Sequence, residues 1–165
     1  MTTQSRRTSF ATIARAPLMA LATAGAILAF GTAAQANEPT VIELTQTGCQ
    51  FLEPEGMDHG YKTMSKADCE AINGDSGAKR LADVEPLVLK PGKYIFRVTN
   101  KNVPYDLGYY LRAASTIKIP FQPKVSGGGL KTGVTKDYVI ELTEGEYVYS
   151  CPLNPTPDYP IIVKN

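Results

Sequence analysis

The segment Val139–Val163, VIELTEGEYVYSCPLNPTPDYPIIV, decides the fold that this sequence predicts. Apolar and polar residues alternate over Tyr138–Leu142 and again over Tyr147–Tyr149, which is the pattern of half-buried strands. Because the four residues between them, Thr143–Glu146, contain a glycine and polar residues, we expect a turn that joins the two strands into a hairpin. A last short strand is expected over Ile161–Val163.

The same period-two pattern recurs upstream, between turn signals rich in proline and glycine. It predicts strands over Val41–Leu44, Leu87–Leu89, Tyr94–Val98 and Leu107–Leu111. Most of the tyrosines fall on these strands, where aromatic side chains form core and cross-strand pairs. Short strands at this spacing indicate an all-β sandwich or barrel.

Residues 52–85 form an insertion between the first two of these strands. The insertion is rich in polar residues, and we expect part of it to be helical. Ser65 followed by Asp68 resembles a capping box, so a helix is expected over Lys66–Ile72. We expect Asn73–Gly74 to end that helix, with a further helical turn over Ala78–Ala82.

Residues 1–36 predict a secretory signal peptide. The segment has three arginines and no acidic residue, then the mostly apolar run Pro17–Gly31, then a small-x-small cleavage pattern ending at Ala36. The run is shorter than the roughly 20 residues that span a membrane. Ser5–Phe10 also resembles a twin-arginine signal, so the export route stays open between that pathway and general secretion. We expect a mature domain, residues 37–165, that is periplasmic or secreted and has no membrane span.

Composition argues against several functions. The 165 residues carry a formal net charge of +1, without a basic stripe, which disfavours nucleic-acid binding. The single histidine and the lack of a Gly-x-Ser-x-Gly elbow leave no serine-hydrolase set and no multi-histidine zinc site. We therefore do not expect an enzyme.

Two stretches together resemble a cupredoxin. They are Leu89–Leu111, LKPGKYIFRVTNKNVPYDLGYYL, and Val139–Val163. The first has the family's Pro-Gly turn, strand and Asn before a proline, and the second has its strand, glycine turn, aromatic strand ending in Cys, ligand loop and last strand. The resemblance implies a Greek-key β-sandwich that is exported and carries copper.

The resemblance also assigns copper-ligand positions, and this chain keeps one of four. A type 1 copper site uses two His, one Cys and a weak axial Met. The Cys is present as Cys151, but the two His positions hold Tyr105 and Asn154, and the axial position falls near Tyr159. We therefore expect the cupredoxin fold without a blue-copper chromophore.

The loop after Cys151 contains four prolines before the last strand. Each proline restricts its own φ and the conformation of the residue before it, so the loop is expected to be stiff and extended. Two interpretations stay open. The loop is either a structural anchor or a binding edge that presents Asn154, Asp158 and Tyr159 to a partner, such as another periplasmic protein.

Met57, His59 and Met64 bring the only histidine and both methionines of the mature chain into eight residues. Thioether and imidazole donors suit Cu(I), so this patch is a candidate copper site. The alternative is local structure: His59 lies among turn residues, and Met64 is placed to pack on the following helix as a hydrophobic staple.

Three cysteines leave one unpaired within the chain. We favour a Cys49–Cys69 disulfide, whose closed loop of about twenty residues is worth roughly 3 kcal/mol. Cys151 is then a free thiol at the family's metal position. If the insertion folds over the ligand loop, Cys151, His59 and a methionine would converge into a non-standard site.

The sequence thus favours an exported cupredoxin-like protein that binds copper through His59, Met57, Met64 and Cys151 and acts in copper handling. Three alternatives remain. One is a metal-free accessory module that binds a partner. The others are an electron-transfer protein and an iron-handling protein, for which carboxylates and a tyrosine supply hard ligands: Glu53, Glu55, Asp58 and Tyr61.

Overall fold

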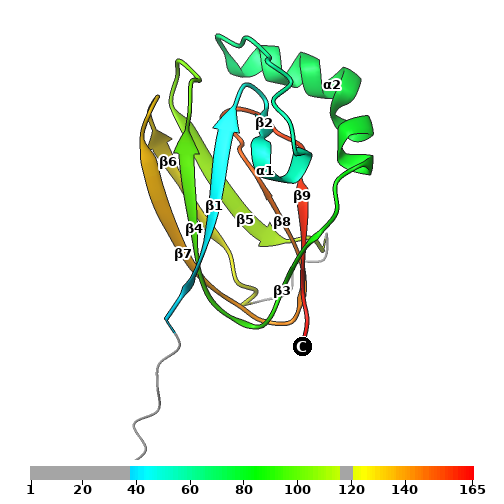
Figure 1. Cartoon of the computed structure of the whole chain (residues 1–165), viewed down its shortest axis with the longest axis vertical. Helices are drawn as coiled ribbons and strands as arrows, with labels where there is room; N and C mark the ends of the chain where they lie inside the picture. Colours follow the sequence, from blue (N-terminus) through cyan, green and yellow to red (C-terminus); the bar gives the residue numbers. More distant parts are fainter. Residues whose placement is uncertain (1–37, 116–120) are drawn as a thin grey trace, which may run out of the picture. The chain divides into compact units, whose positions relative to one another are not determined.

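A computed structural model describes residues 38–115 and 121–165, so the expected signal peptide lies outside the described residues. The described chain forms two mixed sheets (Figure 1). One sheet has, in spatial order, β2 (Gln50–Phe51), β1 (Thr40–Thr47), β4 (Gly92–Asn100) and β7 (Thr135–Leu142). The other has β3 (Leu87–Leu89), β9 (Tyr159–Val163), β8 (Gly145–Ser150), β5 (Leu107–Ala113) and β6 (Val125–Leu130). No helix in these residues is long and apolar enough to cross a membrane.

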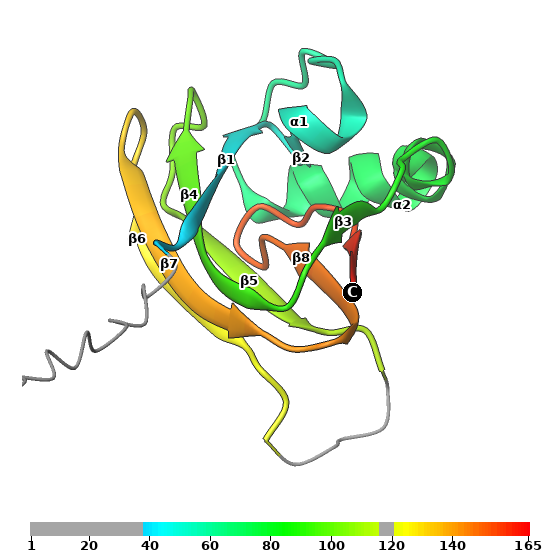
Figure 2. The same ribbon diagram turned by 60° about the horizontal axis from the view of Figure 1, so that its bottom comes forward.

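The β1–β4 and β3–β9 pairs are parallel, and the other strand pairs are antiparallel. Figure 2 separates the layer of β1, β4 and β7 from the layer that contains β3 and β8. The prediction of a mostly β, sandwich-like fold is confirmed, and every predicted strand is present. Two strands were not predicted: the two-residue β2 and the glycine-rich β6.

An aromatic cluster fills the core between the sheets. Tyr149 lies 5.2 Å from Phe51 and 5.3 Å from Tyr159, and Phe96 lies 5.7 Å from Tyr109, measured between ring centroids. All five rings are almost completely buried. Edge-to-face and offset ring pairs of this kind add about 0.5–1.5 kcal/mol each to the hydrophobic gain. The expectation that strand tyrosines lie in the core is confirmed for Tyr109 and Tyr149.

The predicted hairpin of β7 and β8 is wrong. β7 pairs with β4 in one sheet, and β8 pairs with β5 and β9 in the other, so the turn between them crosses the sandwich. Gly145 has a φ of 149° at this corner, a conformation that favours glycine. The alternating pattern shows which side chains face a core, but it does not specify which strand is the neighbour.

The insertion between β2 and β3 contains α1 (Leu52–Glu55) and α2 (Lys66–Ala82). The predicted capping box is confirmed, since the Ser65 N–H donates to Asp68 Oδ2 at 2.9 Å. Hydrogen bonds from the Met64 N–H and the Ser65 N–H lower the pKa of Asp68. The staple is not formed, because the Met64 residue is 78% exposed.

The predicted helix end at Asn73–Gly74 is wrong, because α2 continues through it. A glycine inside a helix costs about 1 kcal/mol relative to alanine. Tertiary contacts offset this cost: Asn73 Nδ2 donates to the Cys49 carbonyl at 3.2 Å and to the Pro155 carbonyl. The local signal was therefore overridden by partners far away in the sequence.

The predicted Cys49–Cys69 disulfide is present, and Cys151 is free and buried. The disulfide joins the β1–β2 turn to α2. Gly48, in the same turn, lets the backbone of the insertion approach closely, since a Cβ at this position would lie 2.5 Å from the Tyr61 carbonyl oxygen. Figure 1 shows α1 and α2 at the end of the sandwich where β1 and β4 end. The insertion is therefore fixed over the same end as the loop between β8 and β9.

Removal of this disulfide tests how much it stabilises the fold. The Cys49→Ala/Cys69→Ala variant should lose about 3 kcal/mol of unfolding free energy, because the cross-link closes a separation of 20 residues. Urea denaturation measures the loss, and the parent protein in reductant serves as the matched comparison. A loss below about 1 kcal/mol in both samples would contradict the assigned role.

Candidate functional site

Cys151, at the start of the loop between β8 and β9, is completely buried. Its sulfur accepts the Gly108 N–H at 3.4 Å and the Asn154 N–H at 3.2 Å. Burial raises the pKa of the thiol, against the smaller opposing effect of these N–H groups. Because the thiolate is the nucleophile and the metal ligand, the raised pKa keeps Cys151 in its less reactive form.

Asn154 is also completely buried, and its side chain connects three parts of the chain. Oδ1 accepts the Cys49 N–H at 3.2 Å and the Tyr105 hydroxyl at 3.0 Å, while Nδ2 donates to the Thr47 carbonyl at 3.0 Å. Oδ1 also lies 2.9 Å from Cys69 Sγ. This is a contact with the disulfide and not a hydrogen bond, since an oxidised sulfur carries no proton.

Tyr105 precedes β5, and its hydroxyl lies beside the N-terminal end of α2. Besides Asn154, the Ser65 carbonyl at 3.2 Å and Thr63 Oγ1 at 3.3 Å are within hydrogen-bond distance. Partial burial raises the pKa of Tyr105. The two positions that the cupredoxin resemblance assigns to histidines are therefore hydrogen-bonded to each other and to the segments around them.

These residues do not fit a type 1 copper ion. Such a site needs two imidazoles and a thiolate, and here the corresponding groups are a phenol, an amide and a buried thiol. The amide and the phenol already have protein partners. The axial position, Tyr159, donates its hydroxyl to Glu55 Oε1 and accepts the Phe51 N–H at 3.3 Å.

The loop between β8 and β9 exposes fewer of its predicted binding residues than a binding edge requires. Asn154 and Tyr159 are 0% exposed, so they are not available on the surface. Asp158 is exposed, and its carboxylate pairs with Arg112 at 2.9 Å. Of the two interpretations left open, the structural anchor agrees with the burial of these side chains.

A second cluster lies within the insertion, around the nearly buried carboxylate of Glu55. Its Oε2 is 2.7 Å from His59 Nε2 and 3.1 Å from Arg80 Nε. The His59 ring stacks on Tyr61 with centroids 5.4 Å apart, and the Arg80 guanidinium lies 5.2 Å from the centre of the same ring. Arg80 was not identified from the sequence, because the Glu55–Arg80 separation carries no recognisable local spacing.

The predicted metal ligands do not come together. Cys151 belongs with Asn154, while the imidazole of His59 belongs with Glu55. Met57 and Met64 are 57% and 78% exposed. Among the described residues, no three His, Cys, Asp or Glu side chains come together in a group that could hold a metal ion. The insertion does cover the ligand loop, but it brings the disulfide to Asn154 and Thr63 to Tyr105.

The residues considered for iron also have separate partners. Glu53 accepts the Thr45 N–H at 2.7 Å, and Asp58 accepts the Gly60 N–H at 2.8 Å. Tyr61 lies 3.5 Å from Ser76 Oγ, and hydrogen bonds to Ser76 and Arg80 lower its pKa. These contacts give the four hard donors local structural roles.

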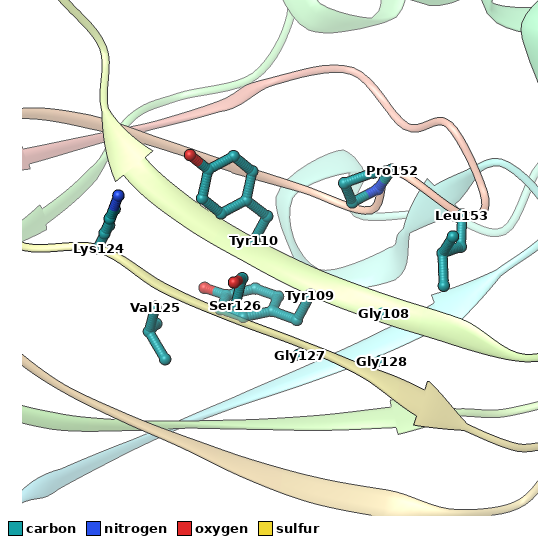
Figure 3. A pocket seen from close by; sticks show the side chains of 10 residues that line it. All are labelled: Gly108, Tyr109, Tyr110, Lys124, Val125, Ser126, Gly127, Gly128, Pro152 and Leu153. Atoms are coloured by element: carbon teal, nitrogen blue, oxygen red, sulfur yellow. The ribbon is translucent and has the colours of Figure 1, made fainter. Parts of the chain in front are cut away.

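Two surface grooves lie beside these clusters. The glycine groove, shown in Figure 3, runs along β5 and β6, with a volume of about 570 Å³ and Leu153 over Gly108 and Gly128. The acidic groove, of about 580 Å³, lies between β1 and β3 and is lined in part by five carboxylates: Glu43, Glu53, Glu55, Asp83 and Glu85. Ile42, Leu44 and Tyr149 are among its apolar lining residues.

Comparison with known proteins adds no family assignment: no family model matches the chain, and no curated protein matches it.

Replacement of Asn154 tests whether its amide holds this end of the fold together. Asn154→Ala should lower the unfolding free energy by about 3 kcal/mol, because the Cys49 N–H and the Thr47 carbonyl lose a buried partner. Asp158→Ala, which removes an exposed ion pair from the same loop, should cost less than about 1 kcal/mol. Chemical denaturation measures both, and equal losses would contradict the role given to Asn154.

Proposed function

We propose that the protein is an exported, cupredoxin-like module that acts by binding another protein and does not use a type 1 copper ion. The observation that carries the proposal is the hydrogen bond between Tyr105 and Asn154 at the positions that the resemblance assigns to the copper histidines. Tyr105 and Asn154 bond to each other, and Asn154 contacts the disulfide, so these side chains replace a metal centre as the structural link at this end of the fold. A module of this kind uses its surface for its function.

The state of Cys151 supports the same proposal. Electron transfer through a cupredoxin site relies on a copper–thiolate bond. Here the thiol is buried, its pKa is raised, and it accepts two backbone N–H groups. Formation of a thiolate without neighbouring imidazoles would leave a buried charge that the site does not compensate.

A second candidate function is copper handling at the patch of Met57, His59 and Met64. It is favoured by the exposure of both methionines, since thioethers that pack against little are available as soft ligands. His59 would have to exchange its contact with Glu55 for the metal. This candidate does not involve Cys151.

An anaerobic Cu(I) competition titration against a chromophoric chelator, with thermal unfolding of the same samples, tests both functions. The proposed module should not compete at micromolar chelator, and one equivalent of copper should leave its Tm unchanged. Nanomolar binding, equivalent to about −12 kcal/mol, would contradict the proposal.

If copper binds, two variants identify the site at which it binds. Loss of binding in Cys151→Ser would place the ion at the ligand loop. Loss in Met57→Leu/Met64→Leu, with binding retained in Cys151→Ser, would support the second candidate instead. Leucine is a suitable replacement because it nearly conserves the volume of methionine.

A further inference from the structure

We infer that the acidic groove between β1 and β3 is the docking site for an extended, basic segment of a partner protein. This inference rests on the proposed function and names the surface and the chemistry of the partner. The groove has a volume of about 580 Å³ and combines an apolar lining with carboxylates. No Lys, Arg or His is among the described residues that line it.

The strand edges on both sides of the groove favour an extended partner. β1 pairs with β2 only through Gln46 and Thr47, and the Thr45 N–H donates to Glu53. Residues 40–44 therefore have no strand partner on that side within the described part of the chain. β3 is the outermost strand of the other sheet and pairs with β9 alone. Such edges offer backbone donors and acceptors to an added strand, which is a common mode of peptide recognition.

The charges of the groove specify the sign of the partner. Asp83 and Glu85 are exposed, between the end of α2 and the start of β3, and Glu43 is exposed on β1. Glu43 has a 3.4 Å contact with Arg97, while the buried carboxylate of Glu55 is neutralised by Arg80. The rim therefore attracts lysine and arginine side chains, and like-charged segments are repelled.

The apolar lining of the acidic groove favours a partner segment in which apolar and basic residues alternate. Leu44 and Tyr149 are buried, whereas Val88 on β3 is 54% exposed. Alternate side chains of an extended segment point to opposite faces, so apolar residues can enter the groove while basic residues reach the rim. The glycine groove of Figure 3 has no such set of charges, since Lys124 is the one charged residue among its described lining residues.

The test uses an alternating lysine–valine peptide as long as β1, added to the isotope-labelled mature protein and followed by amide chemical shifts. Saturable shifts should map to β1 and β3, including the Leu44 and Val88 amides, and they should weaken with added salt. The Asp83→Lys/Glu85→Lys variant should bind at least about tenfold more weakly. Glu70→Lys/Glu141→Lys makes the same change in net charge on α2 and β7, and it should bind within about twofold of the parent.

Absence of saturable shifts overturns the inference, as do shifts confined to Gly108, Gly127 and Leu153 or an equal loss in the two charge variants. These results leave the proposed function standing if the copper titration is also negative. Copper binding at Cys151, in contrast, would overturn the proposed function whatever the peptide does.

Discussion

The side-chain amide of Asn154 holds together the end of the sandwich on which the insertion rests. It bonds both sides of the β1–β2 turn, through the Thr47 carbonyl and the Cys49 N–H, and it accepts the Tyr105 hydroxyl. Cys49 has a φ of 62°, in the left-handed region that L-residues other than glycine seldom adopt. The amide and the disulfide hold that residue in place, and the disulfide in turn fixes α2. Removal of the amide would leave buried groups unpaired at the centre of this arrangement.

The burial of side chains in and beside the loop between β8 and β9 limits which parts of the molecule are available for function. Cys151, Asn154 and Tyr159 are fully buried and have partners in β5, the β1–β2 turn and the insertion. Glu55 contacts both Tyr159 and Arg80, so the second cluster joins the insertion to the start of β9. Surfaces beside the loop are consequently better candidates for recognition than the loop itself, and the acidic groove is the one with a charge pattern that specifies a partner.

The sequence predicted seven of the nine described strands, and the disulfide, because their signals are local. Alternation over Tyr94–Val98 marks a strand whichever sheet it joins, and the spacing of Cys49 and Cys69 suited a stapled insertion. Partner choice was not predictable: β7 and β8 follow one another in the chain yet belong to different sheets. Asn73 stays helical because its side chain bonds the Cys49 and Pro155 carbonyls, contacts that no local pattern contains.

The candidate site could be predicted only in part, for the same reason. The positions of Tyr105, Cys151 and Asn154 followed from the resemblance, and their departure from copper ligands was evident from residue type. Their burial was not evident, since the partners of Asn154 lie 49 residues away at Tyr105 and 105 residues away at Cys49. The four prolines left the loop open between an anchor and a binding edge, and the burial of Asn154 and Tyr159 agrees with the anchor.

The proposed function requires that Tyr105, Cys151 and Asn154 occupy the places of a cupredoxin copper site and close it. Installing the missing imidazoles in the Tyr105→His/Asn154→His variant tests this claim most directly, by Cu(II) titration with visible absorption and with far-ultraviolet circular dichroism to confirm folding. We expect an intense thiolate-to-copper charge-transfer band that the parent lacks and that Cys151→Ser abolishes in the variant. A folded variant without that band, or a parent that already shows it, would rule out the proposed substitution of these residues for copper ligands.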